Sequence, residues 1–272
     1  MNKKKSENLE VKRENDPFEP RDNGDPFKPR EADCSDVFEQ RHKYGKSNSV
    51  VCDTDPIGFA TPDNKSIEEL LVNVSGGFVA LWKKNTVLNW RFNENSMKLY
   101  FADSEAGKRG IRKLLQEALS AWGDSLPVQF KEDDNNWDFE IYMNSQNMCN
   151  ANGACVFASA FFPDSGRHRL QIYPKMFSQI RAEQVETLIH ETGHMFGLRH
   201  FFAQVSEKAA PSEKFGVHSK FSIMNYGSDS KLTAADKNDL KDLYSLAWSG
   251  KLDNINKTPI VFVTPYHNLG HG

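Results

Sequence analysis

The stretch HETGHMFGLRH, from His190 to His200, places three histidines, one glutamate and two glycines in eleven residues. Residues four positions apart lie on one face of an α-helix, so the rings of His190 and His194 can reach a common point. Gly197 can adopt the left-handed conformation that ends a helix, after which the chain can return His200 to that point. Zn²⁺ accepts imidazole nitrogens, and three protein ligands leave a fourth position for water. The spacing therefore predicts one catalytic Zn²⁺ bound by these three histidines.

Glu191 directly follows the first of these histidines, so its side chain is rotated away from the ligand position along the helix. A carboxylate placed there can accept a proton from activated water without binding the metal itself. We therefore predict that Glu191 is the general base. Five fixed residues at this spacing occur by chance in roughly one of 10⁴ to 10⁵ chains of this length, whereas a single histidine is usually an ordinary core or surface residue.

Composition and charge narrow the classes of partner. The chain has 272 residues and a formal net charge of -3, which gives no basic field for nucleic acid. No apolar run approaches the roughly 18 residues of a membrane span, and the polar N-terminus is not followed by the apolar segment of a secretory signal. The expected partner is a protein or peptide substrate, with no nucleic acid and no membrane span. The compartment and the oligomeric state stay open.

Three regions differ in composition. Residues 1–77 are polar and are predicted to be largely disordered or pro-region-like, and residues 251–272 form a C-terminal tail in which TPIVFVTP is either an edge strand or loose. Near the start, DPFEPRDNG (16–24) is echoed by DPFKPREAD (25–33). This tandem repeat is either a chance duplication in a disordered arm or a short linear motif that docks Phe18 and Phe27 on a partner.

Residues 78–250 carry the periodic patterns of a folded domain. Alternating or β-branched segments predict strands at GGFVALWKK, TVLNWRF, VQF, DFEIYM, ACVFASAFF and RLQIY, with TVLNWRF ending at the polar NENS. Helical spacing of apolar residues predicts helices over 105–126, 178–196 and 234–248. This order of strands and helices is typical of an α/β (α+β) fold, with the histidine motif on the second of the three helices.

The motif residues resemble the HExxHxxGxxH signature of the metzincin zinc endopeptidases, without a gap. SIMNY (Ser222–Tyr226), whose methionine lies 24 residues after His200, resembles the metzincin Met-turn. LWKKNTVLNWRF, SAFFPDSGRHRLQIY and LTAADKNDLKDLY are similar to the first strand, the edge strand with its hairpin, and the closing helix of the matrixin subgroup. The resemblance covers about residues 78–250.

This resemblance implies a metzincin-like catalytic domain: a twisted, mostly parallel sheet of about five strands, three main helices and a zinc site in a cleft. His190, His194 and His200 would bind zinc, and Glu191 would act as general base and later as acid. Met224 would form an apolar floor beneath the metal. Tyr226 matches the tyrosine of the astacin and serralysin subgroups, which can hydrogen bond to a developing oxyanion; otherwise it is an aromatic residue of the core or cleft wall.

The chain departs from the matrixin pattern in several places. The edge strand carries Ser159 where a structural zinc would need histidine, and His168 stands without the expected partners, so a second zinc and a calcium site are unsupported. The matrixin latency motif is absent. In VVCDTDP, Cys52 and Asp53 are the upstream candidates for filling the fourth zinc position, against the alternative of an unrelated loop.

The four cysteines leave their pairing open. Cys149 and Cys155 bracket a short polar loop that a disulfide could close, or they are free thiols. Cys34 and Cys52 could pair with each other, stay free or reach a metal.

These residues predict a zinc-dependent metalloendopeptidase. An extended substrate peptide would pair with the strand near residues 156–162. Three alternatives stay open: a non-catalytic zinc-binding or interaction protein, a docking protein that works through the repeated DPF arm, and a hydrolase of non-peptide amides.

Overall fold

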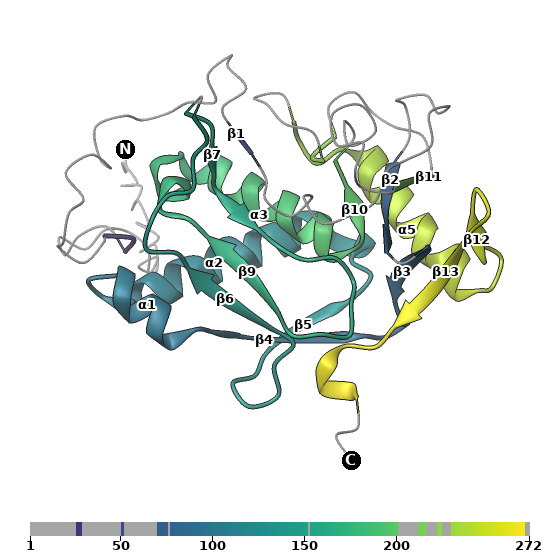
Figure 1. Cartoon of the computed structure of the whole chain (residues 1–272), viewed down its shortest axis with the longest axis horizontal. Coiled ribbons are helices and arrows are strands. Elements are labelled where there is room, and N and C mark those ends of the chain that lie inside the picture. Colours follow the sequence, from purple (N-terminus) through teal and green to yellow (C-terminus); the bar gives the residue numbers. More distant parts are fainter. Residues whose placement is uncertain are drawn as a thin grey trace, which may run out of the picture.

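The computed structural model describes residues 26–28, 50–51, 70–75, 77–151, 153–200, 212–215, 222–224 and 230–269. Within these ranges the fold is a mixed α/β arrangement of two main sheets and four α-helices (Figure 1). The helices are α1 (Glu94–Tyr100), α2 (Ser104–Trp122), α3 (Arg181–Met195) and α5 (Ala234–Trp248). None of the helices in the described ranges is long and apolar enough to cross a membrane.

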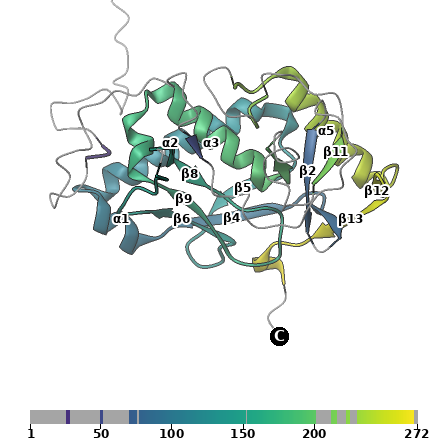
Figure 2. The same ribbon diagram turned by 45° about the horizontal axis from the view of Figure 1, so that its top comes forward.

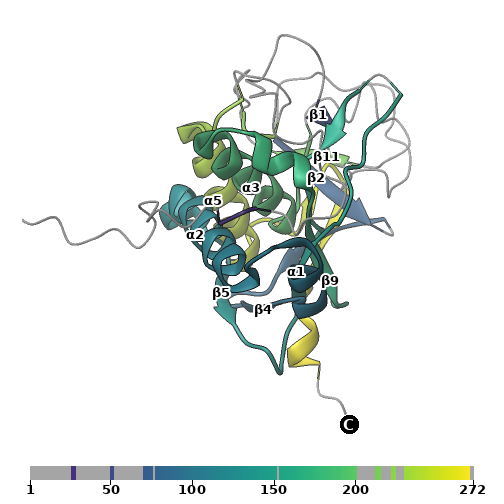
Figure 3. The same ribbon diagram turned by 90° about the vertical axis from the view of Figure 1, so that its left-hand side faces the viewer.

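The predicted mostly parallel sheet of five strands is confirmed. Its order is β5-β4-β6-β9-β8, and every neighbouring pair is parallel except β8 with β9. The long helices α2, α3 and α5 lie together on one side of this sheet (Figures 2 and 3). The strands are β4 (Val87–Phe92), β5 (Gln129–Glu132), β6 (Phe139–Met143), β8 (Ala158–Ser159) and β9 (His168–Ile172).

A second sheet was not predicted. Its order is β10-β2-β3-β13-β12, with β11 also pairing with β2. The strands are β2 (Leu70–Ser75), β3 (Phe78–Trp82), β10 (Leu198–Arg199), β11 (Ser212–Phe215), β12 (Asn254–Ile255) and β13 (Thr258–Val263). Of the two alternatives for TPIVFVTP, the loose segment is wrong, because Ile260–Val263 of β13 pair with β3, while Thr258 and Pro259 pair with the two-residue strand β12.

The three expected main helices are α2, α3 and α5, and the polar NENS that ends a strand also begins a fourth, short helix, α1. The Asn93 side chain accepts a hydrogen bond from the Ser96 backbone N–H (3.0 Å), which satisfies one of the unpaired donors of the first turn. Seven residues make only two turns, too few for a periodic apolar pattern to stand out in the sequence.

Helix α2 carries the predicted stripe of apolar residues, which faces the hydrophobic core. Its buried face includes Ile111, Leu114 and Trp122, which pack into the core between the helices and the sheet. The Asp103 side chain caps its start by accepting from the Ala106 N–H (2.9 Å), and Gly123 ends it with a positive φ of 57°.

Candidate metal centre

The side chains of the three predicted metal-binding histidines converge. Ligand atoms of His190, His194 and His200 all lie within 4.8 Å of one another. The Nε2 atom of His190 is 2.9 Å from that of His200 and 3.2 Å from that of His194. All three side chains belong to buried residues, so the cluster is closed off from most of the solvent.

The turn after α3 brings His200 back to the helix. The Gly197 N–H donates to the His194 carbonyl (2.8 Å), and Gly197 has a φ of 91°, which favours glycine. Strand β10 then follows and pairs antiparallel with β2, Leu198 opposite Val72. This pairing sets the direction of the chain that delivers His200.

The end of α3 is held by two large side chains from other elements. The Trp82 indole donates to the Met195 carbonyl (2.7 Å), and the Tyr244 hydroxyl donates to the Phe196 carbonyl (3.1 Å). Helix ends leave such carbonyls without partners inside the helix, so these bonds fix the turn before His200. Burial raises the pKa of Tyr244, which keeps this hydroxyl a donor.

Backbone carbonyls decide the tautomers of two of the histidines. Nδ1 of His190 lies 2.7 Å from the Ile223 carbonyl, and Nδ1 of His194 lies 2.8 Å from the Leu198 carbonyl. Because a carbonyl only accepts, each Nδ1 donates, and in the neutral rings each Nε2 then carries a lone pair.

This donor set fits a metal ion. Two lone pairs facing each other 3.2 Å apart repel unless a cation lies between them. Tetrahedral Zn²⁺ with nitrogens at about 2.0–2.1 Å requires ligand nitrogens about 3.3 Å apart, close to the two separations of 2.9 and 3.2 Å measured from His190. A second ring nitrogen bonded to a carbonyl is also the usual support of a metal-binding histidine.

A polar bridge supports the carbonyl that orients His190. Ser222 donates to Asp236 at the start of α5, and the Met224 N–H donates to the Ser222 hydroxyl (3.1 Å). Asp236 also accepts from the backbone N–H and hydroxyl of Thr233, both at 2.8 Å. This bridge was not predicted from the sequence, although the T-x-x-D spacing at 233–236 is a capping signal.

Met224 lies against the motif helix. A Cβ atom added to Gly193 would lie 2.6 Å from the Met224 sulfur, so only glycine leaves room at this position of α3. Met224 is fully buried. The contact places an apolar side chain beside the segment that carries His190 and His194.

The remaining predicted site residues divide into two groups. Glu191 is on α3 and buried, at 2% exposed. Tyr226, Cys52 and Asp53 lie outside the described residues, as do Cys34 and Phe18.

The strand expected to bind a substrate is split. Residues Ala158–Ser159 form β8 at the edge of the five-stranded sheet, whereas β7 (Cys155–Val156) pairs in parallel with β1 (Val50–Val51) of the same chain. Part of the predicted substrate strand is thus already paired by the N-terminal region. Phe162, just beyond β8, meets the His194 ring edge-on at 5.4 Å between centroids.

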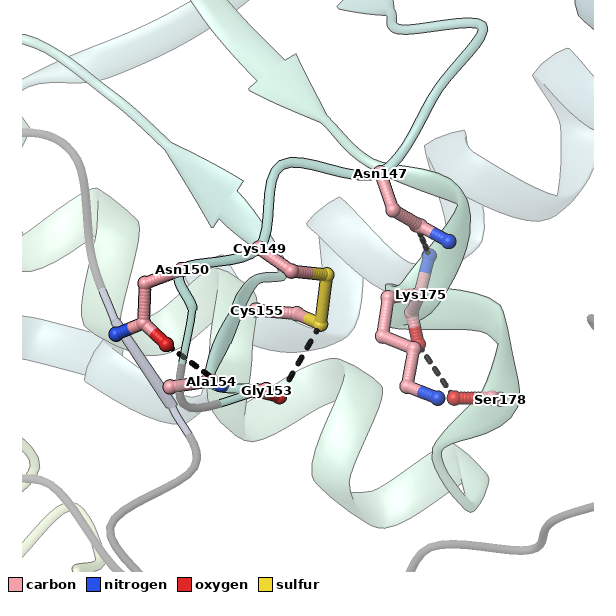
Figure 4. The surroundings of a disulfide bond; sticks show 8 residues. All are labelled: Asn147, Cys149, Asn150, Gly153, Ala154, Cys155, Lys175 and Ser178. Carbon is pink, nitrogen blue, oxygen red and sulfur yellow. Dashed lines mark hydrogen bonds between the residues drawn. A yellow bond between two sulfur atoms is a disulfide. The ribbon is translucent and has the colours of Figure 1, made fainter.

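The open question about Cys149 and Cys155 is answered by a disulfide between them (Figure 4). The bond closes the polar loop directly before β7. Within the same loop the Asn150 side chain accepts from the Ala154 N–H (3.0 Å).

His168 stands apart from the histidine cluster. Its ring stacks on Phe161 at 4.4 Å, and its Nε2 is 3.8 Å from Asp164. Burial lowers the pKa of His168. Among the described residues, His190, His194 and His200 form the one group of three whose ligand atoms converge.

Three imidazoles converge beside a mostly parallel sheet, two of them from the buried helix α3 and the third from directly after β10, and this arrangement indicates a zinc metallopeptidase-like domain. The family model described as Matrixin matches residues 81–245. The chain belongs to the matrixin family.

Solved structures show weaker likenesses. Myroilysin is 14% identical with a TM-score of 0.43, covering 64% of this chain and 98% of its own. The hatching enzyme zinc-protease HCE-1 of the medaka fish Oryzias latipes is 12% identical, with a TM-score of 0.39 and coverage of 61% and 94%. The GM1-bound ECX AB5 holotoxin is 13% identical, with a TM-score of 0.40 and coverage of 65% and 88%. No curated protein matches the chain.

Proposed function

We propose that this protein is a zinc-dependent endopeptidase that hydrolyses peptide bonds in proteins. The observation that carries the proposal is the convergence of the Nε2 atoms of His190, His194 and His200, two of them with their Nδ1 atoms engaged by backbone carbonyls. Residues 78–250 form the catalytic domain in this proposal, with β2, β12 and β13 completing its second sheet from outside those bounds.

The roles of the residues follow from this arrangement. The three imidazoles hold one zinc ion, which when bound supplies Lewis acidity and lowers the pKa of water to about 7. Glu191 accepts a proton from the attacking water and later returns it to the amine nitrogen that leaves. Tyr226 donates a hydrogen bond to the oxyanion that forms on the substrate carbonyl.

Two further features serve substrate binding and the shape of the site. Strand β8 is the end strand of the five-stranded sheet in the described part of the chain, and its outer edge offers backbone groups to an extended peptide next to α3, which carries His190 and His194. Met224 fills the space under Gly193 in the manner of a Met-turn, so that α3 keeps its position relative to Ile223.

The test is cleavage of a diverse peptide mixture by the purified full chain, with cut sites mapped by mass spectrometry. We expect one zinc per chain, cuts that vanish with a zinc chelator, and recovery when zinc is added back. His200→Ala should lose both the bound zinc and the cuts. Bound zinc without any chelator-sensitive cut would overturn the proposal in favour of a non-catalytic zinc-binding protein. Cuts that persist in His200→Ala would show that they arise elsewhere.

A further inference from the structure

Phe27, from the second copy of the DPF repeat, is buried in the folded domain although it belongs to the polar N-terminal region. Its ring stacks on Phe177 with centroids 4.3 Å apart and lies 6.3 Å from that of Phe101. A Cβ atom added to Gly110 of α2 would lie 2.7 Å from the Phe27 ring. Phe177, Phe101 and Gly110, together with Tyr100, whose ring lies 6.2 Å from that of Phe177, surround this ring and form what we call the Phe27 site.

The contacts in the Phe27 site depend on the aromatic ring and on the backbone. The Lys28 carbonyl accepts a hydrogen bond from the Ala102 N–H (3.0 Å), while the Lys28 side chain is exposed. Figure 1 shows this segment, in purple, beside α1. Any residue at position 28 can therefore make the backbone contact, whereas the ring at position 27 fills the space above a glycine.

The walls of the Phe27 site are fixed by the folded domain. Phe177 lies on the 3-10 helix η2 (Pro174–Ser178), where the Asn147 side chain accepts from the Lys175 N–H (2.7 Å) and the Ser178 hydroxyl donates to the Lys175 carbonyl (2.7 Å) (Figure 4). Helix α2 supplies Gly110 from the middle of its length. The site is thus a preformed surface that receives an aromatic ring.

We propose that the Phe27 site is a docking site for the sequence Asp-Pro-Phe-x-Pro-Arg, and that Asp16–Arg21 of the same chain is its second ligand. The two copies, DPFEPR and DPFKPR, differ only at the exposed position, where Glu19 replaces Lys28. Both copies therefore carry every feature that the contacts use. The site holds one copy at a time. When one copy replaces the other, the point at which the N-terminal segment is attached to the folded domain moves by nine residues along the chain.

The Phe27 site lies at the opposite end of α3 from the metal centre. Nine residues separate Arg181, at the start of α3, from His190, which corresponds to about 14 Å of helix. The proposal therefore does not rest on the proposed peptidase activity, and its tests do not use cleavage.

The first experiment compares thermal melting of the full chain with Phe18→Ala, Phe27→Ala and both together. Phe18→Ala serves as the matched control, because it makes the same change in the same local sequence. We expect the melting temperature of Phe18→Ala to equal that of the original chain. The melting temperature of Phe27→Ala should fall slightly, because the first copy replaces the second, and that of the double variant should fall most. Equal melting of Phe27→Ala and the double variant would overturn the proposal.

The second experiment measures binding of a fluorescent peptide of residues 15–23 to the same four chains. The double variant should bind it saturably, while Phe27→Ala should bind at least tenfold more weakly, because its own tethered first copy competes at high effective concentration. Binding to Phe27→Ala as tight as to the double variant contradicts the proposal. If the weakening of peptide binding to Phe27→Ala increased with protein concentration, the competing copy would come from a second molecule of the chain. That result would contradict the proposal that the copy comes from the same chain.

A third variant tests the site itself. Gly110→Ala places a methyl group where the ring lies, and alanine is the better helix former, so α2 keeps its stability. Added to the double variant, Gly110→Ala should weaken binding of the peptide at least tenfold. A peptide carrying alanine in place of its phenylalanine should not bind to any of the chains. Unchanged binding in either case would overturn the docking site.

Discussion

Helices α2 and α3 pack against each other but differ in how much polar surface they bury. Helix α2 buries an apolar stripe that faces the core. Helix α3 buries polar residues beside its apolar ones, with exposed fractions of 2% at Glu191 and 0% at Thr192 and His194. The stripe of α2 comprises Ile111, Leu114, Leu115, Ala118 and Trp122.

The difference reflects two ways of stabilising a helix. Burial of apolar area stabilises α2 directly. The buried polar groups of α3 are tolerated only because they are hydrogen bonded. The Thr187 hydroxyl lies 3.1 Å from the Gln179 side-chain oxygen, the Gln184 amide donates to the Gln179 carbonyl (3.0 Å), and the Trp122 indole of α2 donates to the Thr192 hydroxyl (3.0 Å). Helix α2 supplies stability, and α3 presents the groups that can do chemistry.

The largest expected effect is on α3. Glu191→Gln should lower kcat by about 10²- to 10⁴-fold, because the amide cannot accept the proton. Zinc content and melting temperature should stay close to those of the original chain. Glu186→Gln, the same change five positions earlier on the same helix, is the matched control and should retain activity. A zinc-loaded Glu191→Gln protein with full turnover would remove the role assigned to this carboxylate.

The reciprocal change on α2 should affect stability alone. Leu114 is fully buried in the core, so Leu114→Ala should lower the free energy of unfolding by about 2–5 kcal/mol. Chemical denaturation measures this loss, and the zinc content below the transition should stay at one per chain. Loss of zinc from the folded variant would show that α2 shapes the metal centre as well.

The bond between the two helices tests how they are coupled. Thr192→Val keeps the size of the side chain but leaves the buried Trp122 indole N–H without its acceptor, so unfolding should become easier by about 1–3 kcal/mol. Trp122→Phe and the double variant complete a thermodynamic cycle. If the effects of the two single changes simply add, the hydrogen bond contributes no coupling between the helices.

The smallest expected effect concerns the start of α2. Asp103→Ala removes the acceptor for the Ala106 N–H and should cost about 1 kcal/mol, measured by chemical denaturation. Asp103→Asn keeps an acceptor at the cap and serves as the control. Helix α3 begins differently, since Glu183 accepts from the Ile180 N–H (3.2 Å) while Ile180 has no side-chain acceptor to offer.

Local patterns were sufficient for part of this fold. The third helix was predicted over 234–248, the bounds of α5, because the spacing of its apolar residues is a local signal. The second helix was predicted to start at residue 178, but Pro174–Ser178 form η2, and α3 starts at Arg181. The place of β13 inside a sheet depends on pairing with β3, more than 170 residues earlier, which no local window contains.

The metal centre also has one part that local sequence predicted and another that it did not. The spacing of His190, Glu191, His194, Gly197 and His200 was enough to predict the convergence of the three imidazoles, because helix periodicity and the turn at a glycine act over a few residues. The domain boundaries and the roles of Glu191 and Tyr226 stay predictions. The burial of Phe27 in the folded domain was not predicted, because the rings and the glycine that surround it come from α2, η2 and other distant parts of the sequence.

The sequence by itself determined the donor set and its place on one helix face, because both follow from residue identity and the period of a helix. Only the tertiary structure decided which nitrogen of the His190 and His194 rings is left for a metal. The Ile223 carbonyl that engages His190 lies 33 residues away and is steadied through Ser222 and Asp236. Such contacts exist only once distant segments have packed together, since hydrogen bonds need groups within about 3 Å.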